Sequence, residues 1–192
     1  MKHFNLKTIL ILLVILAIGI GCTIRIVHLN QKYPNANVER YTMNETVTLG
    51  NIEVTITDYQ LLTVPEIKER IEGYDVTYVD SKGNDKDERI LLAEVHLKNI
   101  GEDLDGFSVY LCTLQSGAYT QGMAMEYYPA FNSHLSNPDV VTFLEPGKDM
   151  TIYVPYSIYE ISFSKNAWEK IDTRTFELVF SLYPINRVVT LK

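Results

Sequence analysis

The sequence has few of the residues that a disulfide-stapled or metal-dependent domain needs. Its 192 residues include two cysteines and four histidines, with no C-x-x-C or H-E-x-x-H motif. Two cysteines exclude a disulfide-dense scaffold and a four-cysteine zinc site. Glycine (10) and proline (7) are too few for a collagen-like or low-complexity chain, and the chain contains neither a P-loop nor a G-x-G-x-x-G motif. We therefore expect no metal and no cofactor.

Positive charge is also scarce. Residues 1–30 carry Lys2, Lys7 and Arg25 and no acid, which leaves 14 basic and 24 acidic residues, net −10, for the remainder. Proteins bind nucleic acid largely by neutralising phosphates with basic side chains, so this balance argues against nucleic acid as a partner. The 46% hydrophobic and 21% charged residues are typical of a globular chain.

One stretch near the N-terminus has no charged residue. It runs from Thr8 to Ile24, flanked by Lys7 and Arg25. Seventeen helical residues rise about 25 Å, and roughly 17–25 residues cross a bilayer core, so the stretch predicts one transmembrane helix. Basic residues and no acid precede it. This predicts that the N-terminus lies on the inner side of the cell membrane and the C-terminal domain on the outer side.

Three fates of this segment remain open. We favour an uncleaved signal anchor, because the apolar run is longer than the roughly 7–15 residues of a cleaved signal peptide. The second is lipidation at Cys22, although Gly19 stands where lipoprotein signals usually have Leu. The third is simple cleavage near residues 17–19.

The rest of the chain is predicted to form mostly strands. Apolar and polar residues alternate in 51–59 and 89–99, and further runs lie at 74–80, 107–114, 118–125, 140–144, 150–155, 175–183 and 187–191. Short helices are expected at 63–71, where Thr63 and Glu66 fit a capping box, and at 164–171 around Trp168. Helices do not recur between strands, which argues against a parallel βαβ sheet.

These patterns predict an all-β fold, an antiparallel immunoglobulin-like β-sandwich with one or two short helices behind a single N-terminal transmembrane helix. We expect the anchor over 1–25, a polar stalk or linker over 26–45 and the extracytoplasmic sandwich over 46–192.

Two segments carry a resemblance. EVHLKNIGEDL (Glu94–Leu104) resembles the strand followed by Asn-x-Gly of telokin-like, immunoglobulin-like domains in bacterial surface proteins. LEPGKDMTIYVPYSI (Leu144–Ile158) is similar to their Pro-Gly turn and a strand ending in Val-Pro. In such families the domain follows a membrane or lipoprotein signal in the sequence, and most of these families have no known function. The resemblance therefore implies fold and location and no catalytic residues, and the segments 83–88 and 127–138 depart from its short loops.

Catalytic signals are weak. Ser133 and His134 near Asp139 are triad residue types without triad spacing, and no G-x-S-x-G motif occurs. Cys112 lies in an apolar run and is interpreted as an inert buried thiol. The acidic runs 80–88 and 102–105 are interpreted as solvated hairpin tips, with calcium as the alternative, because neither has EF-hand spacing.

Aromatic residues are the remaining signal for a site. Tyrosine and tryptophan supply large amphipathic contact area, so we predict a binding surface, with cross-strand pairing on a sheet face as the alternative. The predicted residues are Tyr119, Tyr127, Tyr128, Tyr156 and Trp168.

The sequence thus predicts a membrane-anchored, extracytoplasmic, non-catalytic binding domain at the cell surface. The expected partner, besides the membrane, is an envelope protein, a peptide or a wall polymer. The first alternative is an extracellular hydrolase in which His134 or paired acids converge with Tyr127 or Tyr128. The second is a structural accessory subunit of a membrane complex.

Overall fold

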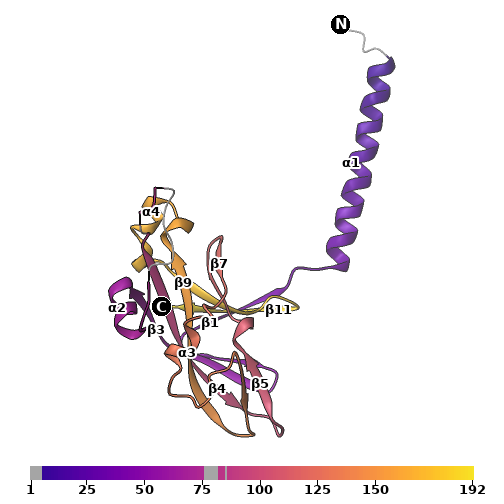
Figure 1. Cartoon of the computed structure of the whole chain (residues 1–192). Coiled ribbons are helices and arrows are strands. Elements are labelled where there is room, and N and C mark those ends of the chain that lie inside the picture. Colours follow the sequence, from indigo (N-terminus) through magenta and orange to yellow (C-terminus); the bar gives the residue numbers. More distant parts are fainter. Residues whose placement is uncertain (1–5, 76–81, 85) are drawn as a thin grey trace. The chain divides into compact units, whose positions relative to one another are not determined.

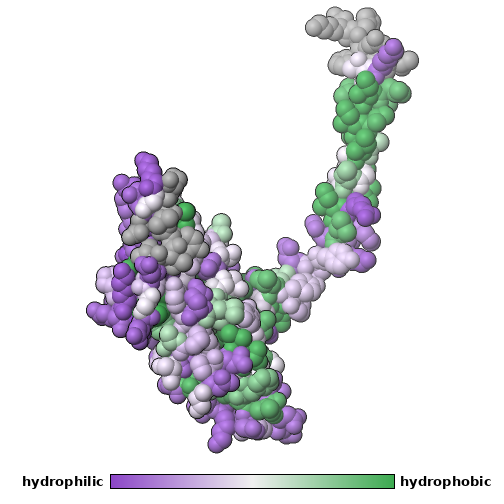
Figure 2. Space-filling model, viewed as in Figure 1, coloured by the Kyte–Doolittle hydropathy of each residue, from purple (hydrophilic) through white to green (hydrophobic). Residues whose placement is uncertain are grey.

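The chain forms two compact units, Met1–Asn37 and Val38–Lys192. The computed structural model describes residues 6–75, 82–84 and 86–192. The first unit is the helix α1 (Leu6–Lys32). From Lys7 to Lys32 none of its residues is buried, and Figure 2 shows apolar side chains along most of its visible face. A helix that exposes so much apolar surface is unfavourable in water and suits a bilayer.

The second unit is built almost entirely of strands (Figure 1). The strands are β1 (Asn37–Thr42), β2 (Thr46–Leu49), β3 (Ile52–Thr63), β4 (Glu88–Asn99), β5 (Asp105–Ser108), β6 (Thr113–Ser116), β7 (Tyr119–Gln121), β8 (Val141–Leu144), β9 (Asp149–Tyr159), β10 (Phe176–Ser181) and β11 (Ile185–Leu191). The short helices are α2 (Val64–Arg70), α3 (Tyr128–Phe131) and α4 (Lys165–Trp168), with 3₁₀ turns η1 (Val109–Leu111), η2 (Glu160–Ser162) and η3 (Ile171–Thr173).

Two larger sheets enclose the main core. Their strand orders are β1-β11-β10-β6-β7 and β2-β3-β4-β9, and β5 and β8 form a small third sheet. The β3–β4 and β4–β9 ladders are long and antiparallel, and Figure 1 shows these strands side by side. Alternate residues of β4 (Leu91, Ala93, Val95, Leu97) share one buried cluster with Leu114, Leu178 and Val189 of the other sheet. The predicted all-β sandwich is confirmed.

A second, smaller cluster covers the other face of β4. It contains Leu62, Ile67, Ile90 and Leu92, and Ile67 comes from α2. The Glu66 carboxylate accepts hydrogen bonds from the Thr63 backbone N–H at 2.7 Å and from its hydroxyl at 2.6 Å. These bonds fix the start of α2 and lower the pKa of Glu66. The predicted helices at 63–71 and 164–171 are present as α2 and α4.

The predicted linker over 26–45 is shorter in the structure. The helix α1 continues to Lys32, and β1 begins at Asn37 in the five-stranded sheet. Arg40 pairs with Glu177 at 2.6 Å and Arg187 with Glu39 at 3.1 Å, so β1 is held by β10 and β11. These partners lie about 140 residues away in sequence. The local pattern of residues 26–45 is polar and does not reveal such partners, so it predicted a linker.

The run 107–114 is interrupted, although alternation predicts one strand. The turn η1 separates β5 from β6, so Leu111 is 60% exposed while Cys112 and Leu114 are buried. The chain changes sheets here, from β5 to β6, which local alternation does not reveal. The predicted strand 74–80 lies outside the described residues from position 76 onward.

Candidate functional site

Two of the five predicted surface aromatics lie in the core. Tyr128 and Tyr156 have no exposed surface, and the Tyr156 hydroxyl donates to the Cys112 carbonyl at 3.3 Å. Neither side chain can contact a ligand at the surface, because both fill the space between the sheets. Cys112 is buried beside them, and burial raises the pKa of its thiol, which keeps it protonated and unreactive.

Tyr127 belongs to a different part of the unit. Its ring lies 5.9 Å from that of Tyr74, in the smaller cluster on the outer face of β4. Tyr74 in turn donates a hydrogen bond of 2.5 Å to the buried carboxylate of Glu88. The other oxygen of Glu88 and the hydroxyl of Ser157 are both buried, and Ser157 lies close enough to Glu88 to favour its charged form. Burial raises the pKa of Glu88.

Tyr119 and Trp168 are brought together by a residue that the sequence analysis missed. The Phe163 ring lies 4.8 Å from that of Tyr119 and 5.9 Å from that of Trp168. The Tyr119 hydroxyl donates to the Ser157 carbonyl at 3.1 Å, which fixes the ring at the end of β9. Phe163 follows η2 in an irregular segment, so no strand or helix periodicity marks it.

A cavity of about 520 Å³ lies beside these rings, and we call it the aromatic pocket. Strand β7 and the segment from η2 to α4 contribute most of its walls. Its lining residues are Ala118, Tyr119, Thr120, Gln121, Ser162, Phe163, Ser164, Ala167 and Arg174. This set combines aromatic faces with hydroxyl and amide groups and one cation. It contains no acidic residue.

Arg174 is held in place at the edge of this pocket. Its Nε donates to the Ser116 hydroxyl at 2.7 Å and its Nη2 to the Ser116 carbonyl at 2.9 Å. The guanidinium also lies over the Phe163 ring, 5.3 Å from the centroid. Within the described residues Arg174 forms no salt bridge, whereas Arg40, Arg89 and Arg187 each contact a carboxylate. Nothing in the local sequence distinguishes Arg174, because its partner Ser116 is 58 residues away.

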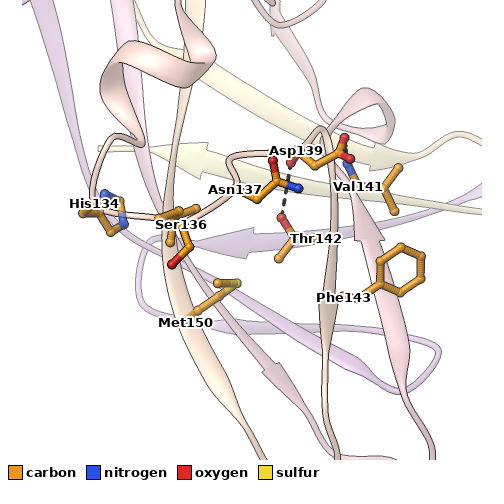
Figure 3. Close-up of a pocket in the computed structure, with 9 residues that line it drawn as sticks. His134, Ser136, Asn137, Asp139, Val141, Thr142, Phe143 and Met150 are labelled. Carbon is orange, nitrogen blue, oxygen red and sulfur yellow. Dashed lines mark hydrogen bonds between the residues drawn. The ribbon is translucent and has the colours of Figure 1, made fainter.

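A second hollow, of about 490 Å³, lies between the 134–139 loop, β8 and Met150 (Figure 3). His134 Nε2 is 3.2 Å from the Thr151 carbonyl, and its ring packs edge-on against Tyr153. The Thr142 hydroxyl donates to the Asp139 carbonyl at 3.5 Å. Figure 3 shows His134 and Asp139 apart along the loop, with Ser136 and Asn137 between them.

The constellation expected of a hydrolase is not assembled in this hollow. His134 lines it, but within the described part of the chain neither Tyr127 nor Tyr128 does. Nor do the described residues bring three or more His, Cys, Asp or Glu side chains together as metal ligands. The acidic run 80–88 falls partly outside the described residues, at 80, 81 and 85.

Comparison with known proteins gives a family without an assigned function. No curated protein shows significant similarity to the chain. Among solved structures it is similar to the yjhA protein of Bacillus subtilis (16% identity, TM-score 0.47, covering 79% of this chain and 99% of that one). It is also similar to an uncharacterised beta-sandwich protein of Clostridium difficile (10%, 0.46, 82% and 96%) and to a conserved hypothetical protein of Bacillus anthracis (15%, 0.47, 72% and 88%). A family profile matches residues 38–187, which is most of the chain, and the protein therefore belongs to the DUF5028 family, a domain of unknown function.

Proposed function

We propose that the chain is a membrane-anchored binding domain that acts outside the cytoplasm. The observation that carries the proposal is α1, whose residues Lys7–Lys32 form a 26-residue helix that contains the charge-free run Thr8–Ile24 and has no buried side chain. The whole helix is about 39 Å long, and its charge-free run of about 25 Å is close to the roughly 30 Å of a bilayer core. Basic residues without acids precede the apolar run, which favours retention of the N-terminus inside.

The aromatic pocket supports the binding half of the proposal. Ligand sites typically combine aromatic walls with a few fixed polar groups, and their volumes are roughly 300–1,000 Å³. Phe163 and Tyr119 provide the walls, and Arg174 is a polar group already held by Ser116. An envelope protein, a peptide and a wall polymer are the partner classes for such a domain.

Location is tested on the full chain in its own cells. We expect mass spectrometry to find the N-terminus intact, and the Cys22→Ala variant to remain in the membrane fraction. Protease added to intact cells that lack an outer membrane should digest the strand-rich unit Val38–Lys192, which we call the β-unit. A β-unit that resists this protease and is digested only after lysis would contradict the proposed orientation. Loss of the Cys22→Ala variant from membranes would instead establish lipidation as the anchor.

Binding is tested with the same chain, purified in neutral detergent micelles and immobilised. Peptide, protein and polymer fractions of the envelope are passed over it at micromolar concentration. Retention of one fraction supports the proposal. Retention of none, by a chain whose circular dichroism shows folded strands, contradicts it.

A further inference from the structure

We infer that the aromatic pocket binds an anionic carbohydrate or polyol polymer, with Arg174 contacting its phosphate or carboxylate group. This inference rests on the proposed binding function and names the ligand class for it. The proposal depends on the free donors of Arg174, on how rigidly the side chain is held, and on the chemistry of the surrounding walls.

Arg174 keeps N–H donors that no described residue accepts. A guanidinium has five N–H groups, and Ser116 accepts two of them, one from Nε and one from Nη2. Three N–H groups, one on Nη2 and two on Nη1, therefore have no partner among the described residues. Two terminal nitrogens in one plane match the two oxygens of a phosphate or carboxylate, which gives a pair of parallel charge-assisted hydrogen bonds.

The Arg174 side chain is held in position before any ligand arrives. Ser116 is only 5% exposed, and its hydroxyl donates to the Thr175 carbonyl at 2.6 Å while accepting from Arg174 Nε. Gly117 follows with φ +62°, a conformation that favours glycine and turns the chain from β6 into β7. With the Phe163 ring on one face, the guanidinium is already ordered, so binding costs little further side-chain entropy.

The charge of the pocket lining favours an anionic ligand. The chain has a formal net charge of −7, yet among the described residues the aromatic pocket is lined by one arginine and no acid. By contrast, the guanidinium of Arg40 lies 2.6 Å from Glu177, and that of Arg187 lies 3.1 Å from Glu39. A cation without a neighbouring carboxylate attracts an anion and repels a cationic ligand, which favours an acidic polymer over a basic peptide.

The walls favour a polyhydroxylated ligand. The exposed hydroxyls of Thr120, Ser162 and Ser164 and the carboxamide of Gln121 both donate and accept hydrogen bonds, as the hydroxyls of a sugar or polyol require. The rings of Tyr119 and Phe163 offer apolar area for the carbon skeleton of such a unit.

The inference is tested with the full chain in neutral detergent micelles and three defined polymers. Polyglycerol phosphate carries phosphate, polygalacturonate carries carboxylate, and dextran carries no charge. We expect binding to one or both charged polymers that weakens as salt increases, and no binding to dextran. The phosphate and carboxylate probes separate the two possible sources of negative charge.

Substitutions then place the binding at Arg174. Arg174→Gln should weaken binding of the charged polymer by about tenfold or more. The affinity of Arg174→Lys should lie between those of the unmodified chain and Arg174→Gln, because lysine keeps the charge and loses the paired geometry. Arg40→Gln is the matched control, since Arg40 is an exposed arginine outside the pocket, and it should bind within about twofold of the unmodified chain. Thr120→Glu tests the same site without touching the Ser116 contacts, and its new carboxylate should abolish binding.

Equal binding of dextran, unchanged binding by both Arg174→Gln and Thr120→Glu, or no binding of either charged polymer would overturn the inference. If Arg174→Gln does not fold, the result for Thr120→Glu decides. Retention of envelope material by the unmodified chain in any of these cases would leave the proposed binding function standing with another ligand.

Discussion

At the scale of single residues, Asn132 acts as a substitute for a neighbouring strand. Its Oδ1 accepts from the Tyr153 N–H at 2.8 Å, and its Nδ2 donates to the Tyr153 carbonyl at 2.7 Å. Strand β9 is an edge strand of its sheet, and unpaired edges invite association with other chains. The Ala124 N–H donates a hydrogen bond of 2.8 Å to the Pro155 carbonyl on the same edge. The segment 127–138, which departs from the resemblance, thus closes an edge.

We expect Asn132→Ala to lower the free energy of unfolding by about 2–4 kcal/mol, because it leaves the backbone N–H and carbonyl of Tyr153 without partners. Urea denaturation followed by circular dichroism measures the change. Asn137→Ala is the control, since Asn137 is exposed at the rim of the second hollow and should change stability by less than about 0.5 kcal/mol. Equal effects of the two variants would show that Asn132 does not hold the edge.

Glu88 links stability to pH. Burial raises its pKa above the ordinary value of 4.5, so the folded chain holds this proton more tightly than the unfolded chain. Its contribution to stability is therefore greatest below about pH 4.5, falls as pH rises toward the higher pKa of the folded state, and then stays constant.

We expect Glu88→Gln to remove this part of the pH dependence, because the amide oxygen still accepts from Tyr74 and cannot ionise. Unfolding free energies measured from about pH 4 to pH 8 should show the variant gaining relative to the unmodified chain as pH rises. Glu53→Gln, a partly exposed glutamate on β3, is the control. Identical pH profiles for Glu88→Gln and the unmodified chain would contradict the prediction.

At the scale of elements, the sequence predicted well the helix and strands that are marked by a short repeating pattern of apolar and polar residues. The 63–71 helix and the strands β3, β4 and β9 follow from periodicity and capping, which depend on residues a few positions apart. The interruption at η1 and the inclusion of β1 were not predicted, because they depend on which sheet a strand joins. For β1 the neighbouring strand is β11, which lies at the other end of the chain.

The helix α1 gives a prediction at this scale. Leu13→Arg with Leu16→Arg should move the chain out of the membrane fraction, because arginine near the centre of a transmembrane helix costs about 2.5–3.5 kcal/mol per residue. Fractionation followed by immunoblotting measures the distribution. Ile161→Arg is the control, because Ile161 is an exposed apolar residue of the β-unit at 57%. Unchanged membrane association of the double variant would show that α1 is not the anchor.

At the scale of the whole molecule, the chain separates into the helical unit and the β-unit. Both main buried clusters consist of residues from β-unit elements or their connecting loops. We therefore expect a fragment of residues 36–192 to unfold cooperatively at the same temperature as the β-unit of the full chain, within about 2 °C, since its core is unchanged. Differential scanning calorimetry measures both, and a fragment without a cooperative transition would contradict the prediction.

Local patterns along the chain were sufficient to predict an apolar helix and a domain built mainly of strands. Periodicity and composition reflect the backbone and its solvent, and they need no knowledge of distant partners. Only the three-dimensional arrangement buried Tyr128 and Tyr156 while it brought Phe163 and Arg174 to one pocket with Tyr119. Burial and pairing depend on contacts between residues far apart in the chain, such as Arg174 with Ser116, and no local pattern contains that information.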